Sequence, residues 1–301
     1  DMRVGSRRLV AAMRVFADCF PTPQYRALYR EARDVTRALG AVRDLDVLID
    51  HARNPESAAF EGGRLGLDYL IALWTAERAQ ARKPMLRALN RLERTRFPDR
   101  ISAYLREEAD AYTVGLDQVH LKPPTTSHLP DGGRTPFREA APPLLLERYQ
   151  EFYSFEPFVE HPEAETELHD MRIAAKWLRY TMELFAPAYP DGLADTLDAV
   201  KGFQELLGDL HDSDVRRDLM DQALSRPLQV EGLLAVGRML PDPVILGLRL
   251  QRAQEQAVRD EVYRSFRRRW RKLAKDGFAA RLRGSLSPSG EPPAKDGCRH
   301  G

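Results

Sequence analysis

The stretch "DMRIAAKWLRYTMELF" at residues 170–185 decides the fold, because the chain contains a second copy of it. That copy is "DMRVGSRRLVAAMRVF" at residues 1–16, and six positions are identical between the two. A second matched pair follows in the same order, "LGAVRDLDV" at 39–47 and "LGDLHDSDV" at 207–215, and the two offsets are 169 and 168 residues. Two matched segments at nearly the same offset predict a duplicated unit.

The dominant apolar spacing is helical, and no stretch shows the alternation of a half-buried strand between turn signals. The pattern predicts eight helices, with breaks at prolines: 2–19, 24–53, 64–96, 98–118, 137–159, 165–186, 192–222 and 243–275. The expected fold is therefore all-α, with two repeats that are each a four-helix bundle.

Proline and glycine content divides the chain further. Repeat one is expected at 1–118 and repeat two at 137–280, within one domain over 1–280. Residues 119–136 form a Pro-rich linker, and the tail at 284–301 has the composition of a disordered segment.

Cysteine usage and hydropathy limit the environment of the chain. Cys19 and Cys298 lie far apart and form no disulfide framework, which favours a reducing, cytoplasmic compartment. No apolar run approaches the roughly 20 residues of a membrane span.

The net charge of +1 conceals segregated charges. Residues 1–43 carry nine arginines against four acids, 76–106 carry nine basic residues against three acids, and 259–283 carry ten against three. Residues 147–170 hold eight acids and one arginine. Such blocks create strong local fields although the sum cancels.

Helical geometry separates a core stripe from a cationic face on the repeated helices. The predicted core stripe of 165–186 is Met171, Leu178, Met182 and Phe185. The basic residues of this helix gather within about 80° on a neighbouring face: His169, Arg172, Lys176 and Arg179. The first copy repeats the separation, with a core stripe of Met2, Leu9, Met13 and Phe16 and a basic face of Arg3, Arg7 and Arg14.

The next helix of each repeat shows the same division. In 24–53 the arginines lie opposite the apolar positions: Arg26, Arg30, Arg33 and Arg37. In 192–222 one side carries Lys201, Gln204, Gly208 and His211, whereas the acids occupy another side that can face water. Four cationic positions match between the copies: Arg3 with Arg172, Arg7 with Lys176, Arg33 with Lys201, and Arg43 with His211. Arginine and lysine are suited to phosphate, so these positions suggest two related anion-binding surfaces.

Two plainer interpretations remain open. An arginine stripe on a helix is often only a solvated face. The aspartates that follow the matched glycines, at 44, 46, 212 and 214, are expected to cap a helix turn or to hold Arg43 and His211. Their alternative role is a metal site, but apart from His211 no histidine or cysteine stands near them at metal-ligand spacing.

At this point the residues resemble the CHAD domain, the conserved-histidine α-helical domain. The resemblance rests on "LHDMRIAAKWLRYTMELF" (168–185) with "LGDLHDSDV", and on "DMRVGSRRL" with "LGAVRDLDV". It extends over roughly 1–275 and implies two four-helix repeats in a pseudo-twofold arrangement. It also implies binding of inorganic polyphosphate in a basic groove or pore and association with polyphosphate granules.

The resemblance places the family's second-repeat histidine on His169, and the first-repeat histidine would precede residue 1. Its basic positions fall on residues of both repeats: Arg3, Arg7, Arg8, Arg33, Arg37, Arg43, Arg172, Lys176, Arg179 and Lys201. The basic helices 76–106 and 259–275 are expected to add walls to the groove: Arg82, Lys83, Arg87, Arg264 and Arg268. With Arg14, Arg30 and His211 these residues form the candidate polyphosphate site.

The sequence thus predicts a non-catalytic polyphosphate-binding protein without cofactor, metal or catalytic residue. Sulfate or phosphate ions are expected to occupy the same site in crystals. One alternative is nucleic-acid binding through the same surface, although aromatics among the basic residues are sparse. The other is a metal-dependent phosphate-processing enzyme that uses His169, His211 and the aspartates, although no glycine loop or zinc-ligand spacing appears.

Overall fold

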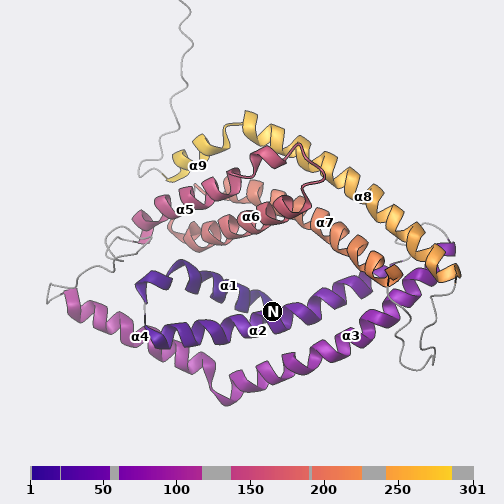
Figure 1. Ribbon diagram of the computed structural model, residues 1–301. Coiled ribbons are helices and arrows are strands. Elements are labelled where there is room, and N and C mark those ends of the chain that lie inside the picture. Colours follow the sequence, from indigo (N-terminus) through magenta and orange to yellow (C-terminus); the bar gives the residue numbers. More distant parts are fainter. Residues whose placement is uncertain are drawn as a thin grey trace, which may run out of the picture. The chain divides into compact units, whose positions relative to one another are not determined.

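The computed structural model describes residues 2–20, 22–54, 61–116, 137–189, 192–225 and 242–286, and these residues contain helices and no strand (Figure 1). The all-α prediction is confirmed. The α-helices of the described residues are α1 (Met2–Val15), α2 (Pro23–Arg53), α3 (Glu61–Arg94), α4 (Phe97–Leu116), α5 (Phe137–Tyr153), α6 (Glu165–Phe185), α7 (Ala194–Ser225), α8 (Asp242–Lys275) and α9 (Phe278–Leu286).

Helices α1 to α8 match the eight predicted helices to within three residues at each end, with two exceptions. The helix predicted over 2–19 ends at Val15, and residues 17–19 form a separate short 3-10 helix. The helix predicted over 137–159 ends at Tyr153, where the Ser154 hydroxyl donates to the Glu151 carbonyl, and a separate short 3-10 helix, Glu156–Phe158, contains Pro157. Helix α9 was not predicted, and it includes residues 284–286 of the expected disordered tail. The linker prediction at 119–136 and the rest of the tail lie outside the described residues.

The chain forms two compact units. Unit 1 contains Asp1–Pro123 and Asp212–Arg259, and unit 2 contains Pro124–His211 and Asp260–Gly301. Helices α7 and α8 contribute to both units. The compact units therefore do not coincide with the sequence repeats.

Unit 1 holds two apolar clusters. One cluster joins α1, α2 and α4 around Met13, Leu28 and Phe97. The start of α2 is fixed there, because Thr22 caps the helix by accepting a hydrogen bond from the Tyr25 amide at 3.1 Å. The other cluster joins α2, α3 and the unit 1 parts of α7 and α8: Ile49, Ala52, Leu67, Leu70, Trp74, Met220, Ala223 and Leu248.

Helices α3 and α8 approach each other most closely at two glycines. Both helices have 34 residues, and Gly66 and Gly247 are the sixth residue of each. A Cβ on Gly66 would lie 2.6 Å from the Leu248 amide nitrogen and 2.7 Å from the Gly247 carbonyl carbon, so only glycine fits. Contact between matched positions is what a twofold relation produces. It supports the repeat symmetry, which stays a prediction.

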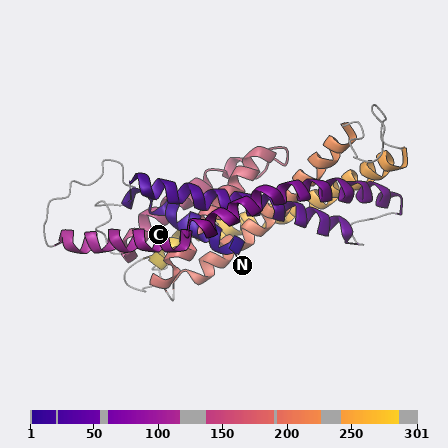
Figure 2. The ribbon, with the colours of Figure 1, turned by 90° about the horizontal axis from the view of Figure 1, so that it is seen from below.

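Helix α2 runs alongside α3 over much of its length, as Figures 1 and 2 both show. Two polar contacts define their antiparallel register. Arg78 of α3 pairs with Asp46 of α2, and the Thr95 hydroxyl just after α3 donates to Glu31 at 2.8 Å. Both contacts lie on the side of α3 that carries the buried Trp74.

Unit 2 packs α5, α6, the first part of α7 and the second part of α8. The Trp270 ring lies 5.4 Å from the Phe152 ring and 5.9 Å from the Phe203 ring, measured between centroids. The core stripe predicted for α6 is confirmed, since all four of its members are fully buried: Met171, Leu178, Met182 and Phe185. In the first copy Met13 is buried, but the prediction is wrong for Met2, which is 57% exposed as the first residue of α1.

Candidate functional site

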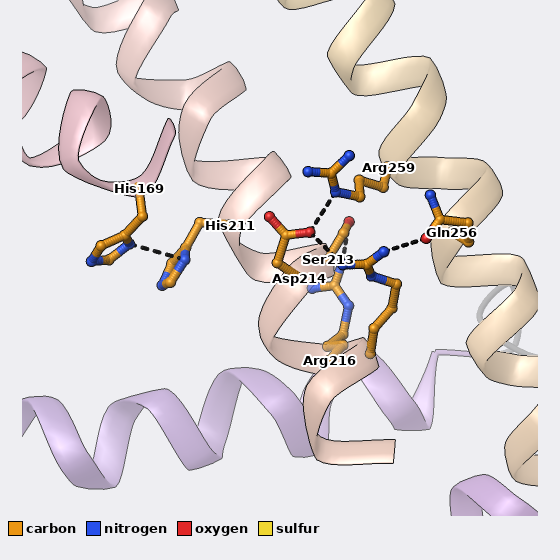
Figure 3. A network of polar contacts seen from close by, with 8 residues as sticks. His169, His211, Ser213, Asp214, Arg216, Gln256 and Arg259 are labelled. Carbon is orange, nitrogen blue, oxygen red and sulfur yellow. Dashed lines mark hydrogen bonds and ion pairs between the residues drawn. The ribbon is translucent and has the colours of Figure 1, made fainter. Parts of the chain in front are cut away.

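Two histidines meet between α6 and α7 in unit 2. His169 Nδ1 lies 3.0 Å from His211 Nδ1, and the ring centroids are 4.2 Å apart (Figure 3). One nitrogen must donate and the other must accept, so at least one imidazole is neutral while the contact persists. The contact joins residues 42 positions apart, and both were predicted as site residues.

A second contact lies about one turn away along both helices. Arg172 passes over Gly208, where an added Cβ would lie 3.9 Å from Arg172 Nε. Together the two contacts fix an antiparallel register, which places Lys176 at the level of Gln204 and Arg179 at the level of Lys201. We call this set the α6–α7 ladder: His169, Arg172, Lys176 and Arg179 of α6, and Lys201, Gln204, Gly208 and His211 of α7. The structure thus brings together two faces that the sequence predicted separately.

The ladder is electrostatically positive around His169. Burial is the largest cause that lowers the pKa of His169 below its ordinary value, and the charges of Arg172 and Lys176 lower it further. Asp170 opposes the shift but does not cancel it. His169 is therefore mainly neutral at pH 7, and a bound anion would favour its protonation.

Three ladder cations have neighbours that orient them. Lys176 lies over the Trp177 ring at 5.2 Å, and Arg179 lies over the Tyr180 ring at 4.9 Å and 3.5 Å from Glu183. Lys201 pairs with Asp198 at 3.0 Å. Arg172 makes no ion pair with a carboxylate in the described part of the chain. The aromatic rings beside the ladder are half-buried, each with a cation over it.

Gln204 is a polar residue of the ladder that the candidate list lacked. Its Oε1 atom is buried and has no hydrogen-bond partner among the described residues. Its position between Lys201 and Gly208 on one side of α7 was the available signal.

The predicted site residues of α1 and α2 belong to unit 1. Six of them are exposed: Arg7, Arg8, Arg14, Arg30, Arg33 and Arg37. Arg3 and Arg43 are partly exposed. Gly40, which matches Gly208, would meet nothing within 4 Å if it carried a Cβ, so no side chain covers it as Arg172 covers Gly208. The contact made in unit 2 is therefore not repeated in unit 1.

Of the five predicted wall residues, three lie on α3 in unit 1 and two lie on α8 in unit 2. Arg264 and Arg268 are on the side of α8 opposite to the buried Phe266 and Trp270, and they do not line the α6–α7 ladder. Lys83 and Arg87 are on the side of α3 that faces away from α2, and Arg82 is exposed on its flank. These residues form separate outer surfaces.

The expectation that the matched aspartates cap a helix end was wrong for Asp46 and Asp214, because both lie inside helices. Asp46 pairs with Arg78, whereas Asp214 accepts from Arg217 at 2.9 Å and from Arg259 (Figure 3). The aspartates instead connect α2 to α3 and α7 to α8.

A buried ionic cluster in unit 1 was missed altogether. Glu255 of α8, whose side chain is 3% exposed, lies 2.9 Å from Arg216 of α7 and 2.9 Å from His51 of α2. Burial by itself raises the pKa of Glu255, but the hydrogen bond from His51 and the charge of Arg216 outweigh it and lower the pKa. The carboxylate is therefore ionised at neutral pH and ties three helices together.

No group of three or more metal-ligating side chains occurs among the described residues. No described helix is long and apolar enough to cross a membrane.

The family model for the CHAD domain matches residues 1–221 of the 301. The chain belongs to the CHAD domain family. The match covers α1 to α6 and most of α7, and it includes every residue of the α6–α7 ladder of this CHAD domain. No curated protein matches the sequence. CHAD domains are known at the family level for polyphosphate binding and are generally binding domains, not catalytic ones.

Proposed function

We propose that this CHAD domain binds inorganic polyphosphate through the α6–α7 ladder and through the arginines of α1 and α2, without catalysis. The observation that carries the proposal is the ladder itself. Four cations and a histidine pair from two helices make up the ladder, and Arg172 has no carboxylate partner among the described residues. Such an array repels itself, and a polyanion would relieve this repulsion.

The mode of recognition follows from the chemistry of the ligand. Polyphosphate is a flexible chain with about one negative charge per unit, so binding depends on charge density. Its affinity should fall steeply with salt because counterions are released, as for single-stranded nucleic acids. Cytoplasmic polyphosphate granules are the proposed location, where the domain would target or organise the polymer.

The decisive test compares polyphosphate affinity of the wild type with Arg172→Ala/Lys176→Ala/Arg179→Ala by isothermal titration at several salt concentrations. We expect the triple variant to bind at least about tenfold more weakly, with the slope of log K against log salt reduced by about 2. A matched control removes three exposed arginines elsewhere: Arg106, Arg249 and Arg281. Equal affinities of the triple variant and this control would contradict the proposal.

The rival functions are separated in the same series. Steady release of phosphate from polyphosphate with divalent metal present, abolished by His169→Ala, would support a phosphate-processing enzyme instead. Preference for single-stranded DNA over polyphosphate at fixed salt would support nucleic-acid binding.

A further inference from the structure

Four cations recur at matched positions of the two longest described helices. They are the residues at positions 23, 27, 31 and 34 of the 34-residue helices α3 and α8. On α3 they are Lys83, Arg87, Arg91 and Arg94, and on α8 they are Arg264, Arg268, Lys272 and Lys275. Each set spans about 16 Å along its helix and lies within about 80° around the axis. We call them the α3 outer stripe and the α8 outer stripe.

Both outer stripes face solvent. All eight side chains are exposed, whereas the opposite side of α8 carries the buried Phe266, Trp270 and Leu273. On α3 the opposite side carries the buried Trp74 and the contacts to α2. Core packing accounts for the matched Gly66 and Gly247, but it cannot account for matched cations on a solvated face.

The surroundings show which arginines of α8 are available. Arg267 and Arg271 lie outside the stripe, and both pair with the carboxylate of Glu160, which Arg271 contacts at 3.0 Å. In the α8 outer stripe Arg264 pairs with Glu261 at 2.8 Å. The same position of α3 holds Gln80, which accepts from Lys83 at 2.8 Å. Among the described residues the α3 outer stripe thus has no carboxylate partner and is the more positive of the two.

We infer that each outer stripe binds its own segment of polyphosphate, so that one molecule bridges polyphosphate strands. This inference rests on the proposed function and adds the valency of binding to it. Cations that follow one another every 4.5 to 6 Å or so along a straight line suit a flexible polyanion.

The neighbouring side chains favour this ligand over two others. A helix that lies on a membrane needs an apolar face, but between Lys83 and Arg94 the only large exposed apolar side chain is Leu86. Single-stranded nucleic acid is bound with aromatic platforms, but the aromatics within the α8 stripe region, Phe266 and Trp270, are buried.

The test uses the full chain with long-chain polyphosphate, and it measures stoichiometry by titration and bridging by light scattering. One variant carries Lys83→Gln/Arg87→Gln/Arg91→Gln/Arg94→Gln, and a second carries the corresponding change at the α8 outer stripe. We expect each variant to keep tight binding within about threefold, because the α6–α7 ladder is intact. We expect fewer phosphate units bound per protein and severalfold less scattering, with the larger loss for the α3 variant.

The controls separate failure of this inference from failure of the proposed function. A charge-matched variant replaces exposed arginines outside both stripes, Arg53, Arg106, Arg249 and Arg281, by Gln, and it should scatter like the wild type. If the wild type does not bind polyphosphate, the proposed function fails. If it binds but both stripe variants keep its stoichiometry and scattering, only the bridging inference is overturned. The bridging inference would also be overturned if the stripe variants lost binding to anionic vesicles or duplex DNA while their polyphosphate stoichiometry stayed unchanged.

Discussion

At matched positions of α3 and α8, the first repeat buries apolar side chains, whereas the second repeat buries polar side chains. Leu70 and Trp74 are the tenth and fourteenth residues of α3, and the same positions of α8 hold Gln251 and Glu255. All four side chains are buried. On α2 and α7 the contrast continues, because Leu48 and Ile49 match Arg216 and Arg217.

An ion pair is common to both repeats. Arg78 and Arg259 are the eighteenth residues of α3 and α8, and they pair with the matched Asp46 and Asp214. The first pair is partly exposed, at 39% and 30% of the two side chains, whereas Arg259 is only 3% exposed. Both repeats therefore contain the ion pair that fixes the register of the two helices, but the side chains around this pair differ in polarity between the repeats.

Because of this difference, a helix of one repeat cannot take the place of the matched helix in the other repeat. Glu255 of the second repeat forms ion pairs with Arg216 of its own repeat and with His51 of the first repeat. A buried charge is tolerated only with partners in place, so the cluster favours one arrangement of helices over alternatives. Three experiments, from the largest expected effect to the smallest, test this contrast.

Arg216→Met should have the largest effect, a loss of about 3–5 kcal/mol in the free energy of unfolding, because it removes a partner of the buried Glu255. Urea denaturation measures it. The double variant Arg216→Met/Glu255→Met should lose less than the single variant, since no uncompensated charge remains. The matched first-repeat change, Leu48→Met, should cost less than about 1.5 kcal/mol. If the loss in the double variant equalled the sum of the losses in the two single variants, Arg216 and Glu255 would not be coupled.

Arg259→Met and Arg78→Met compare the shared ion pair in its two environments. We expect a loss of about 3 kcal/mol for Arg259, because Asp214 would lose a charged partner in a buried setting. Arg78 should cost less than about 1 kcal/mol, because its pair is accessible to water. Equal losses in urea denaturation would mean that burial does not decide the strength of this contact.

The smallest effect concerns pH, because the second repeat carries His211 where the first has Arg43, and His211 contacts His169. The pKa of His169 is lowered in the folded state, so the unfolded chain takes up a proton first as the pH falls. This residue should reduce stability as the pH drops through about 6.5, and the loss should level off below the folded pKa. His169→Gln should lose less stability than the wild type between pH 7.5 and 5.5. Parallel pH profiles of the two proteins would contradict the assignment.

Most of the helical framework could be predicted, because apolar periodicity and prolines are local signals. The buried stripe of α6 and the residues of the ladder followed from helical geometry alone. Helix α9 was missed because the Gly- and Pro-rich residues after it dominate the local composition. The prediction that Met2 is buried was wrong because apolar periodicity does not show where the end of a helix extends past the helices that pack against it.

The sequence by itself determined a duplicated all-α chain, its core stripes and the cationic faces of its helices, because each depends on residues within a few turns of one another. Only the tertiary structure decided which charges meet. The His169–His211 contact, the partners of Asp46 and Asp214, and the outward direction of the two outer stripes depend on helix register and on which side of each helix is buried. Those are set by packing between distant segments, which no local pattern encodes.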